Sequence, residues 1–301
     1  MKTFWSLVQR NIKLFFKDRA LFFVAMISPV VLLVLFVTFL GSTYKNTFLN
    51  IISEFGVSVQ DGVVDGAVVA YLFSALLSVS CVTVAFCCNV MSIQDKINGV
   101  KNDFEVTPVK KTTIAFSYLV ATFIVSMMIC LIIFAILLIM TSTMGQFYFS
   151  FSDICFSLLI IAALCLFGAI LSSIVCHFCS TQSQLGAITG IVSSCYGFLC
   201  GAYMPISQFS SGISNFISIL PGTFGTSLLK NRLLSGYLAE MSSEGVPGGA
   251  LDAIRHGFDL KLSFSGNEIS INLMTIVLAV TIIISLALFV ILNKVSLKHK
   301  R

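Results

Sequence analysis

The chain has 301 residues, of which 57% are hydrophobic and 10% are charged, and its mean hydropathy is +1.00. Ordinary soluble domains carry about 25% charged residues, so this composition excludes a soluble globular protein and indicates a polytopic membrane protein. The net charge of +5 comes from basic residues spread over segments between apolar runs, which membrane topology explains better than nucleic-acid binding.

Residues 1–19 predict an amphipathic helix that lies in the plane of the membrane interface. Trp5 and Phe15 fall on an apolar face, whereas Arg10 and Lys13 fall on the opposite face. A signal peptide is the alternative, but the charged region is long and no cleavage site with small residues follows it.

Six apolar runs follow, each long enough to cross a bilayer, since about 20 helical residues span roughly 30 Å of hydrocarbon. The runs cover residues 21–40, 66–90, 114–140, 154–175, 185–204 and 273–292. Pro29 lies inside the first run, where neighbouring helices would tolerate a kink. None of the six runs contains Asp, Glu, Lys, Arg or His. Ion-coupled carriers and voltage sensors place ionisable groups at membrane depth, so neither class is favoured.

Two segments between the runs are long. Residues 41–65 are polar and mainly acidic, as expected for an outer loop. Residues 205–270 begin with a semi-apolar part, interrupted by Pro205, Pro221 and several glycines. This part predicts short broken helices that dip into the outer leaflet as a re-entrant element, with a surface loop as the alternative. Residues 237–270 are polar and rich in Gly and Ser, which predicts a mobile loop.

The distribution of basic residues predicts the topology. Thirteen of the 18 Lys and Arg residues lie in the N-terminal segment, between the second and third runs, or in the C-terminal tail. Excess basic residues in short segments mark the cytoplasmic side. We therefore expect both termini in the cytoplasm, and residues 41–65 and 205–270 outside. No internal repeat is visible, which gives no support to an inverted-repeat secondary transporter.

Residues 94–111, QDKINGVKNDFEVTPVKK, form a polar loop between the second and third runs. Asp95 and Lys96 end the second run, and Gly99 permits a sharp turn because glycine tolerates positive φ. A short amphipathic helix is predicted next, and Pro108 ends it. The residues of this helix that would meet a soluble partner are Val100, Lys101, Asp103 and Phe104. A solvated hairpin without a partner is the alternative.

This loop resembles the coupling loop of ABC transporter type 2 permeases, the membrane subunits of ATP-driven exporters. Asp95, Lys96, Gly99 and Pro108 match the family pattern, whereas Asn98 stands where an acidic residue is common. The re-entrant stretch after the fifth run is also similar to that family, so the resemblance extends over nearly the whole chain. It implies that the loop seats in a groove of an ABC ATPase subunit. It also implies that two permease chains work as a homodimer or heterodimer, with the second and fifth helices lining the path.

Two sets of residues in the apolar runs fit that implication. The fifth run contains two GxxxG elements, which let helices approach closely within one chain or between two chains. These glycines are Gly186, Gly190, Gly197 and Gly201. The second run contains polar residues that would face the substrate path or would bond to their own backbone. These residues are Ser74, Ser78, Thr83 and Asn89.

No group of residues predicts catalysis or a cofactor bound by this chain. A Gly-rich phosphate loop ending in Gly-Lys-Ser/Thr is absent from the sequence, so ATP and Mg²⁺ are expected only in a partner subunit. The ten cysteines lie in or beside apolar runs, which argues against a secreted disulfide framework. Cys176, His177 and Cys179 bring soft ligands together, but ligands this close in sequence do not easily form a tetrahedral site. No metal site is expected.

The sequence therefore predicts an all-α polytopic membrane protein, built as one permease domain over residues 1–301. It has six transmembrane helices, an N-terminal interfacial helix and a re-entrant element before the last helix. The predicted function is export of a drug, lipid or peptide across a bacterial cell membrane, with multidrug efflux as one such role, because uncharged walls favour lipophilic or amphipathic cargo. Export of a polysaccharide or lipid-linked glycan is the close alternative. A non-transporting membrane scaffold or sensor subunit is the alternative from another class.

Overall fold

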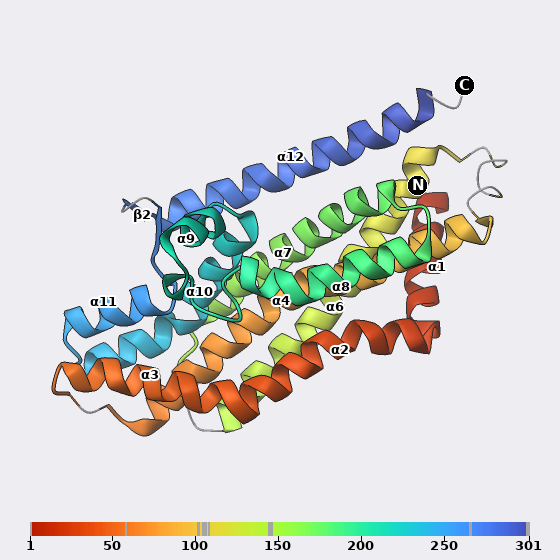
Figure 1. Ribbon diagram of the computed structural model, residues 1–301. Helices are drawn as coiled ribbons and strands as arrows, with labels where there is room; N and C mark the ends of the chain where they lie inside the picture. Colours follow the sequence, from red (N-terminus) through yellow and green to blue (C-terminus); the bar gives the residue numbers. More distant parts are fainter. Residues whose placement is uncertain are drawn as a thin grey trace.

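The computed structural model describes residues 2–57, 59–100, 103, 107, 109–143, 147–264 and 267–298. Within these residues the chain is nearly all helical, with one short two-stranded antiparallel sheet (Figure 1). The long helices are α1 (Lys2–Lys17), α2 (Arg19–Leu35), α3 (Gly41–Glu54), α4 (Asp61–Ile97), α6 (Lys111–Thr143), α7 (Phe151–Phe178), α8 (Gln182–Leu199), α10 (Pro221–Ser243) and α12 (Ile271–Lys298). The shorter elements are the π-helical η1 (Phe36–Leu40), the 3-10 turn η2 (Ile206–Gln208), α9 (Ser211–Ser218), α11 (Gly248–Gly257), β1 (Leu262–Phe264) and β2 (Asn267–Ile269).

Helix α4 is the centre of the bundle, and α2, α6, α7, α8 and α10 pack around it (Figure 1). In the most apolar stretch of α4, 94% of the residues are buried, against 11% in the most apolar stretch of α12. A helix that is apolar on every side belongs in an interior, and the small residues of α4 let its neighbours approach. Helix α7 comes close at Gly168, where an added Cβ would lie 2.7 Å from the backbone oxygen of Cys81.

Five helical segments among the described residues are long and apolar enough to cross a membrane. They are Arg19–Glu54, Asp61–Ile97, Lys111–Thr143, Phe151–Phe178 and Ile271–Lys294. Large apolar side chains on their outer faces, such as Phe23, Ile132 and Ile283, are more than half exposed. Such faces fit lipid rather than water, which confirms a helical multi-pass membrane protein. The expected crossing at 185–204 overlaps α8, which starts in polar sequence and is not one of the five.

Helix α1 divides its apolar face between the protein and the surroundings. Val8 and Phe15 are buried together with Asn11, and the helix packs against α6. Trp5, in contrast, is 52% exposed. One part of the amphipathic pattern therefore attaches α1 to the bundle, and the other part is available to lipid headgroups.

The two ends of the bundle differ in what they carry. Helix α1 and the last turns of α12 lie at the same end as the adjoining ends of α4 and α6 (Figure 1). Helices α9 and α11 and strand β2 lie at the opposite end (Figure 1). The short elements α9, α11 and β2 are therefore found at one end of the long helices, and α1 is found at the other (Figure 1).

Two stretches that were expected to be polar loops are largely helical. Residues 41–65 contain α3 and the start of α4, because Tyr44, Phe48 and Ile52 recur at helical spacing and are buried. Residues 237–270, expected to form a mobile loop, contain the end of α10, all of α11 and the two strands. In both stretches, most residues are polar, so the few apolar residues at helical spacing did not stand out in the sequence.

Residues 205–236 also differ from the expected series of short broken helices. They hold η2, α9 and the first part of the long helix α10. Pro221 stands in the first turn of α10, where a missing N–H removes no helical hydrogen bond. The helix continues through Gly225. This glycine packs directly against α7, where an added Cβ would lie 2.3 Å from the side chain of Leu164.

A buried ion pair fixes α10 to the segment that follows α11. The Lys230 ammonium lies 3.4 Å from a carboxylate oxygen of Asp259 and donates to the backbone oxygen of Gly201 at 2.9 Å. The Asp259 carboxylate accepts from the backbone N–H of Ile206 at 2.9 Å. The ammonium also lies 4.7 Å from the ring centroid of Tyr71 on α4. These contacts join α4, α10 and the η2 region into one unit.

Candidate functional site

The end of α4 is tied to three other parts of the chain through Asp95 and Lys96, where the coupling loop was expected to begin. Asp95 is buried and pairs with Arg10 of α1, with N–O distances of 2.7 and 3.2 Å. The hydroxyl of Tyr118 on α6 donates to the same carboxylate at 2.5 Å. The Lys96 ammonium donates to the backbone oxygen of Cys179, just after α7, at 2.8 Å. We call these five residues the Asp95 junction.

The Asp95 junction links the end of α4 to α1, to α6 and to the turn after α7 by ionic and hydrogen-bonding contacts rather than by apolar packing. A guanidinium that binds a carboxylate through two nitrogens is a strong and directional contact. Burial, the largest single influence, would lower the pKa of Arg10, but the hydrogen bonds and charges of Asp95 and Tyr118 together outweigh it and raise that pKa above its ordinary value. The guanidinium therefore stays charged. A movement of the end of α4 would be passed to α1, to α6 and to the turn between α7 and α8.

The structure describes part of the predicted coupling loop beyond α4. Gly99 has a φ of 77°, the left-handed conformation that a turn at this glycine requires. Val100 is half-buried, and Asp103 is exposed. The backbone N–H of Asp103 donates to the oxygen of Gly99 at 3.3 Å, which closes one helical turn. The coupling candidates Lys101, Phe104 and Pro108 lie outside the described residues.

The four polar residues of α4 that were candidates for a substrate path are all covered by the chain itself. Ser74 and Thr83 donate to backbone oxygens of α4. Ser78 bonds to Thr226 of α10, and Asn89 donates to two serine hydroxyls of α7. In this arrangement the four residues connect helices or bond to their own helix. Their place on a substrate path stays a prediction.

The glycines of α8 and the turn after it divide into an open pair and a packed pair. Gly186 and Gly190 are exposed, and no atom within 4 Å would meet a Cβ added to either one. At Gly197 an added Cβ would lie 2.2 Å from the ring of Tyr203, and Gly201 has a φ of 66°. The second GxxxG element therefore serves packing and the helix end within one chain. The first element leaves a face of small residues open.

A cavity of about 520 Å³ lies between the α2–η1–α3 stretch and α4. Its lining is mostly apolar and includes Phe36, Leu72 and Phe73. One ion pair belongs to the lining, between Lys45 of α3 and Asp65 of α4, with an N–O distance of 2.6 Å. The π-helical η1 contributes to the wall, and π turns are frequent at functional sites. The cavity therefore offers apolar contact together with one charged pair.

Soft metal ligands gather away from the place that the sequence singled out. Cys176 and Cys179 are buried in a small apolar cluster with Ile93. In the described part of the chain, one group of potential metal ligands comes together, from three different helices. Its members are Cys81, Cys130 and Cys165.

Residues 2–233 match the family model described as ABC-2 type transporter. The match covers most of the chain and includes the Asp95 junction, the cavity and α8. The chain belongs to the ABC-2 type transporter family. No curated protein and no solved structure matches it.

Membership in the ABC-2 type family makes this chain the membrane permease of a transporter, a subunit without a catalytic site, as the sequence predicted. ABC-2 type permeases generally pair with ABC ATPase subunits and typically bind no cofactor themselves. The family match ends within α10, so α11, the two strands and α12 lie beyond the matched residues.

Sequence reasoning placed Asp95 and Lys96 at the start of the coupling loop of this ABC-2 type permease but did not find their partners. Arg10 was assigned to the polar face of an interfacial helix. Tyr118 was one more residue of an apolar run. An arginine in the middle of one helix and an aspartate at the end of another were the available signal. Many pairings between charged residues of different helices were equally compatible with it.

Proposed function

We propose that this ABC-2 type permease exports a lipophilic or amphipathic substrate, such as a drug, lipid or peptide, with ATP hydrolysed by a separate subunit. The observation that supports this cargo class is the cavity of about 520 Å³ beside α4. Small-molecule sites typically measure about 300–1,000 Å³. Apolar walls with one ion pair, Lys45 with Asp65, fit a molecule that has an apolar body and a polar end.

The ATPase subunit would act on the permease through residues 94–111. Val100 and Phe104 are four residues apart, so a short helix would present both on one face to a groove of the ATPase. ATP-driven closure of the ATPase pushes on this loop. The Asp95 junction, in which Asp95 holds Arg10 of α1 and Tyr118 of α6, passes the movement to the neighbouring helices.

The proposed topology has six crossings, with α8 as the fifth, and a re-entrant element formed by the region before α10 and its first turns. Helix α8 packs beside the central α4, which supports its membrane position. Thr226 of α10 bonds to Ser78, a residue in the middle of the apolar run 66–90, so the start of α10 reaches deep into the bundle. Both termini and residues 94–111 then face the cytoplasm of a bacterial cell.

A second permease chain would pack on the open face of α8. Gly186 and Gly190 leave room for a close helix approach. Ile191 on the same helix is 61% exposed and would gain apolar contact from a partner helix. A pair of permease chains and a pair of ATPase chains would then form the working transporter.

The cargo class is tested in proteoliposomes that contain the chain together with its ATPase subunit. An added amphipathic amine should stimulate ATP hydrolysis severalfold. Val69→Trp should remove this stimulation and leave basal hydrolysis unchanged, because Val69 lines the cavity. Val24→Trp is the matched control, since Val24 is 51% exposed on α2. A response of Val69→Trp equal to that of the control would show that the cavity is not the cargo site.

Coupling is tested in the same preparation with Phe104→Asp. If Phe104 enters a groove of the ATPase, the new carboxylate there is unpaired and costs about 3 kcal/mol of binding free energy. The variant should insert normally but should lose both the ATPase on purification and export. The control is Phe264→Asp in β1, where Phe264 is 41% exposed. Stoichiometric ATPase and full export in Phe104→Asp would mean that residues 94–111 are a solvated hairpin.

A further inference from the structure

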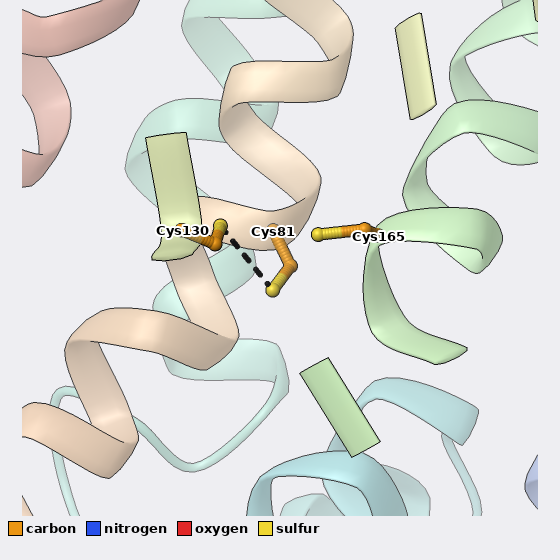
Figure 2. A group of neighbouring side chains, drawn as sticks. All are labelled: Cys81, Cys130 and Cys165. Carbon is orange, nitrogen blue, oxygen red and sulfur yellow. Dashed lines mark hydrogen bonds between the residues drawn. The ribbon is translucent and has the colours of Figure 1, made fainter. Parts of the chain in front are cut away.

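Cys81, Cys130 and Cys165 meet between α4, α6 and α7 (Figure 2). All three side chains are completely buried, and their sulfur atoms lie within 4.8 Å of one another. The sulfurs of Cys81 and Cys130 are 3.6 Å apart. Each cysteine lies well inside an apolar run of its helix, so the cluster is far from both ends of the bundle.

Close helix packing brings the three thiols together. Gly168 of α7 brings its backbone against α4, and an added Cβ there would lie 2.7 Å from the oxygen of Cys81. This approach points Cys165 of α7 at the cysteine on α4 (Figure 2). Among the described residues, the one oxygen that accepts a hydrogen bond from these sulfurs is that of Ile161, 3.9 Å from the sulfur of Cys81. Thiols are weak donors, so no strong hydrogen bond competes for these groups.

The spacing of the three sulfurs fits one central ion. Bonds of about 2.3 Å from one ion to three thiolate sulfurs place the sulfurs about 4 Å apart in a trigonal plane. They place the sulfurs about 3.4 Å apart in the pyramid that an ion with a lone pair forms. The observed separations, from 3.6 Å to within 4.8 Å, require only small side-chain movements to reach either arrangement. Thiolate ligands select soft ions. The described surroundings supply three ligands, which favours a three-coordinate ion over a tetrahedral one.

Charge decides which soft ion belongs there. Net charge in apolar surroundings is strongly unfavourable. Three thiolates leave one negative charge around Zn²⁺ and two around Cu⁺, but they leave none around a trivalent ion. We propose that Cys81, Cys130 and Cys165 form a binding site for a trivalent thiophilic metalloid, arsenic(III) or antimony(III).

The binding step balances without any change of oxidation state. Arsenous acid is an uncharged molecule near neutral pH, so it can enter an apolar region. Three As–O bonds break and three As–S bonds form. Each thiol proton leaves with a hydroxide as water, giving three water molecules for each arsenic bound. A disulfide between Cys81 and Cys130 would be a different reaction, because it requires an oxidant.

Arsenic bound in this way would connect α4, α6 and α7 covalently. The connection should raise the unfolding temperature of the chain, because the bound form must lose its ligand before the helices separate. It should also oppose any movement of these helices against one another. The site is distinct from the proposed cargo cavity, whose described lining includes none of the three cysteines.

The test uses the purified full chain in lipid nanodiscs, reduced with a phosphine and incubated with sodium arsenite. After desalting, arsenic is quantified by mass spectrometry, and its ligands are counted by X-ray absorption. We expect one arsenic per chain, three sulfur neighbours and a higher unfolding temperature. Cys81→Ala, Cys130→Ala and Cys165→Ala should each weaken binding at least tenfold. Cys176→Ala is the matched control, because that buried cysteine lies outside the cluster.

Several results would overturn the site. Arsenic with only two sulfur neighbours would point to a cysteine pair elsewhere. Unchanged arsenic binding in Cys81→Ala would also show that the arsenic binds elsewhere. Retention of Zn²⁺ or Cu⁺ in place of arsenite would refute the charge argument. The number of sulfur atoms bound to arsenic is measured on the unmodified chain. The proposal is therefore tested even if a cysteine variant fails to fold.

Discussion

Lys230 and Asp259 carry opposite charges into a part of the molecule that water hardly reaches, with side-chain exposures of 1% and 5%. Burying a charge costs about 3–5 kcal/mol of folding free energy unless the charge is paired and hydrogen-bonded. Here the ammonium has Asp259 and the Gly201 oxygen, and the carboxylate has the Ile206 N–H. Each charge therefore holds a different loop in place around α10.

Lys230→Met should destabilise the chain by about 3–5 kcal/mol, because it leaves the buried Asp259 carboxylate without its cation. Adding Asp259→Asn should recover at least half of the loss. The asparagine carbonyl can still accept from Ile206, and asparagine tolerates the φ of 58° found at this position. Thermal unfolding in detergent measures both variants. Equal midpoints for Lys230→Met and the unmodified chain would contradict the role of the pair.

Asp95→Asn should separate stability from coupling at the Asp95 junction. Arg10 is partly exposed, with 30% of its side chain accessible, so water can compensate it, and the stability cost should be about 1 kcal/mol. Export should fall much more, because the junction loses the charge that holds α1 to α4. Asp252→Asn is the matched control, since Asp252 pairs with Arg255 on the exposed surface of α11. Equal export by the two variants in proteoliposomes would remove the junction from the coupling route.

Helices α4 and α12 are both strongly apolar in sequence, yet they occupy opposite positions in the bundle (Figure 1). Helix α4 is rich in Ser, Ala, Cys and Gly, which let several helices approach it at once. Helix α12 is dominated by bulkier Ile, Leu and Val, whose side chains fit fluid lipid. Side-chain size, in addition to hydropathy, therefore separates the central helix from the peripheral one.

The two GxxxG elements should respond differently to the same substitution. Gly197→Leu should lower the unfolding temperature of the single chain, because its side chain would overlap the ring of Tyr203. Gly190→Leu should leave that temperature unchanged, since no atom lies within 4 Å of the added Cβ. It should instead reduce crosslinking between two permease chains. Normal crosslinking and export by Gly190→Leu would mean that the open face of α8 is not the contact between chains.

The chain as a whole returns to the end at which it starts. Helix α1 and the last turns of α12 lie at the same end of the bundle, and α9, α11 and β2 lie at the other end (Figure 1). Arg10 and Lys96 lie at the first end, whose Lys and Arg residues agree with the cytoplasmic side. The whole-molecule prediction concerns which end faces outward.

Ser243→Cys should react with a membrane-impermeant maleimide in intact cells, and Asp103→Cys should react only after lysis. Both positions are exposed. Ser243 ends α10 at the end of the bundle that carries α11, and Asp103 follows α4, which ends at the opposite end (Figure 1). The background replaces Cys155 and Cys195 by serine, because these two native thiols are exposed. The reverse labelling pattern would invert the topology. Labelling of both sites in intact cells would show that the two ends are not separated by the membrane.

The sequence alone determined the class of protein, the approximate positions of most long helices and the family. These properties depend on local patterns: uninterrupted apolar runs, the Asp95, Lys96 and Gly99 sequence at the end of α4, and the balance of basic residues. The same reasoning was wrong for residues 41–65, which were predicted to form a loop. The apolar stripe of α3, which includes Phe48, lies in polar sequence. Hydropathy averages over neighbours, so such a stripe disappears in the average.

Tertiary structure decided which distant residues meet. The pairing of Arg10 with Asp95, the burial of Lys230 beside Asp259, and the gathering of Cys81 with two other cysteines all join different helices. Whether such groups touch depends on the rotation and depth of each helix relative to its neighbours. Packing against small residues such as Gly168 fixes these quantities. An apolar run specifies that a helix exists, but many rotations bury it equally well, so only the packed bundle selects one.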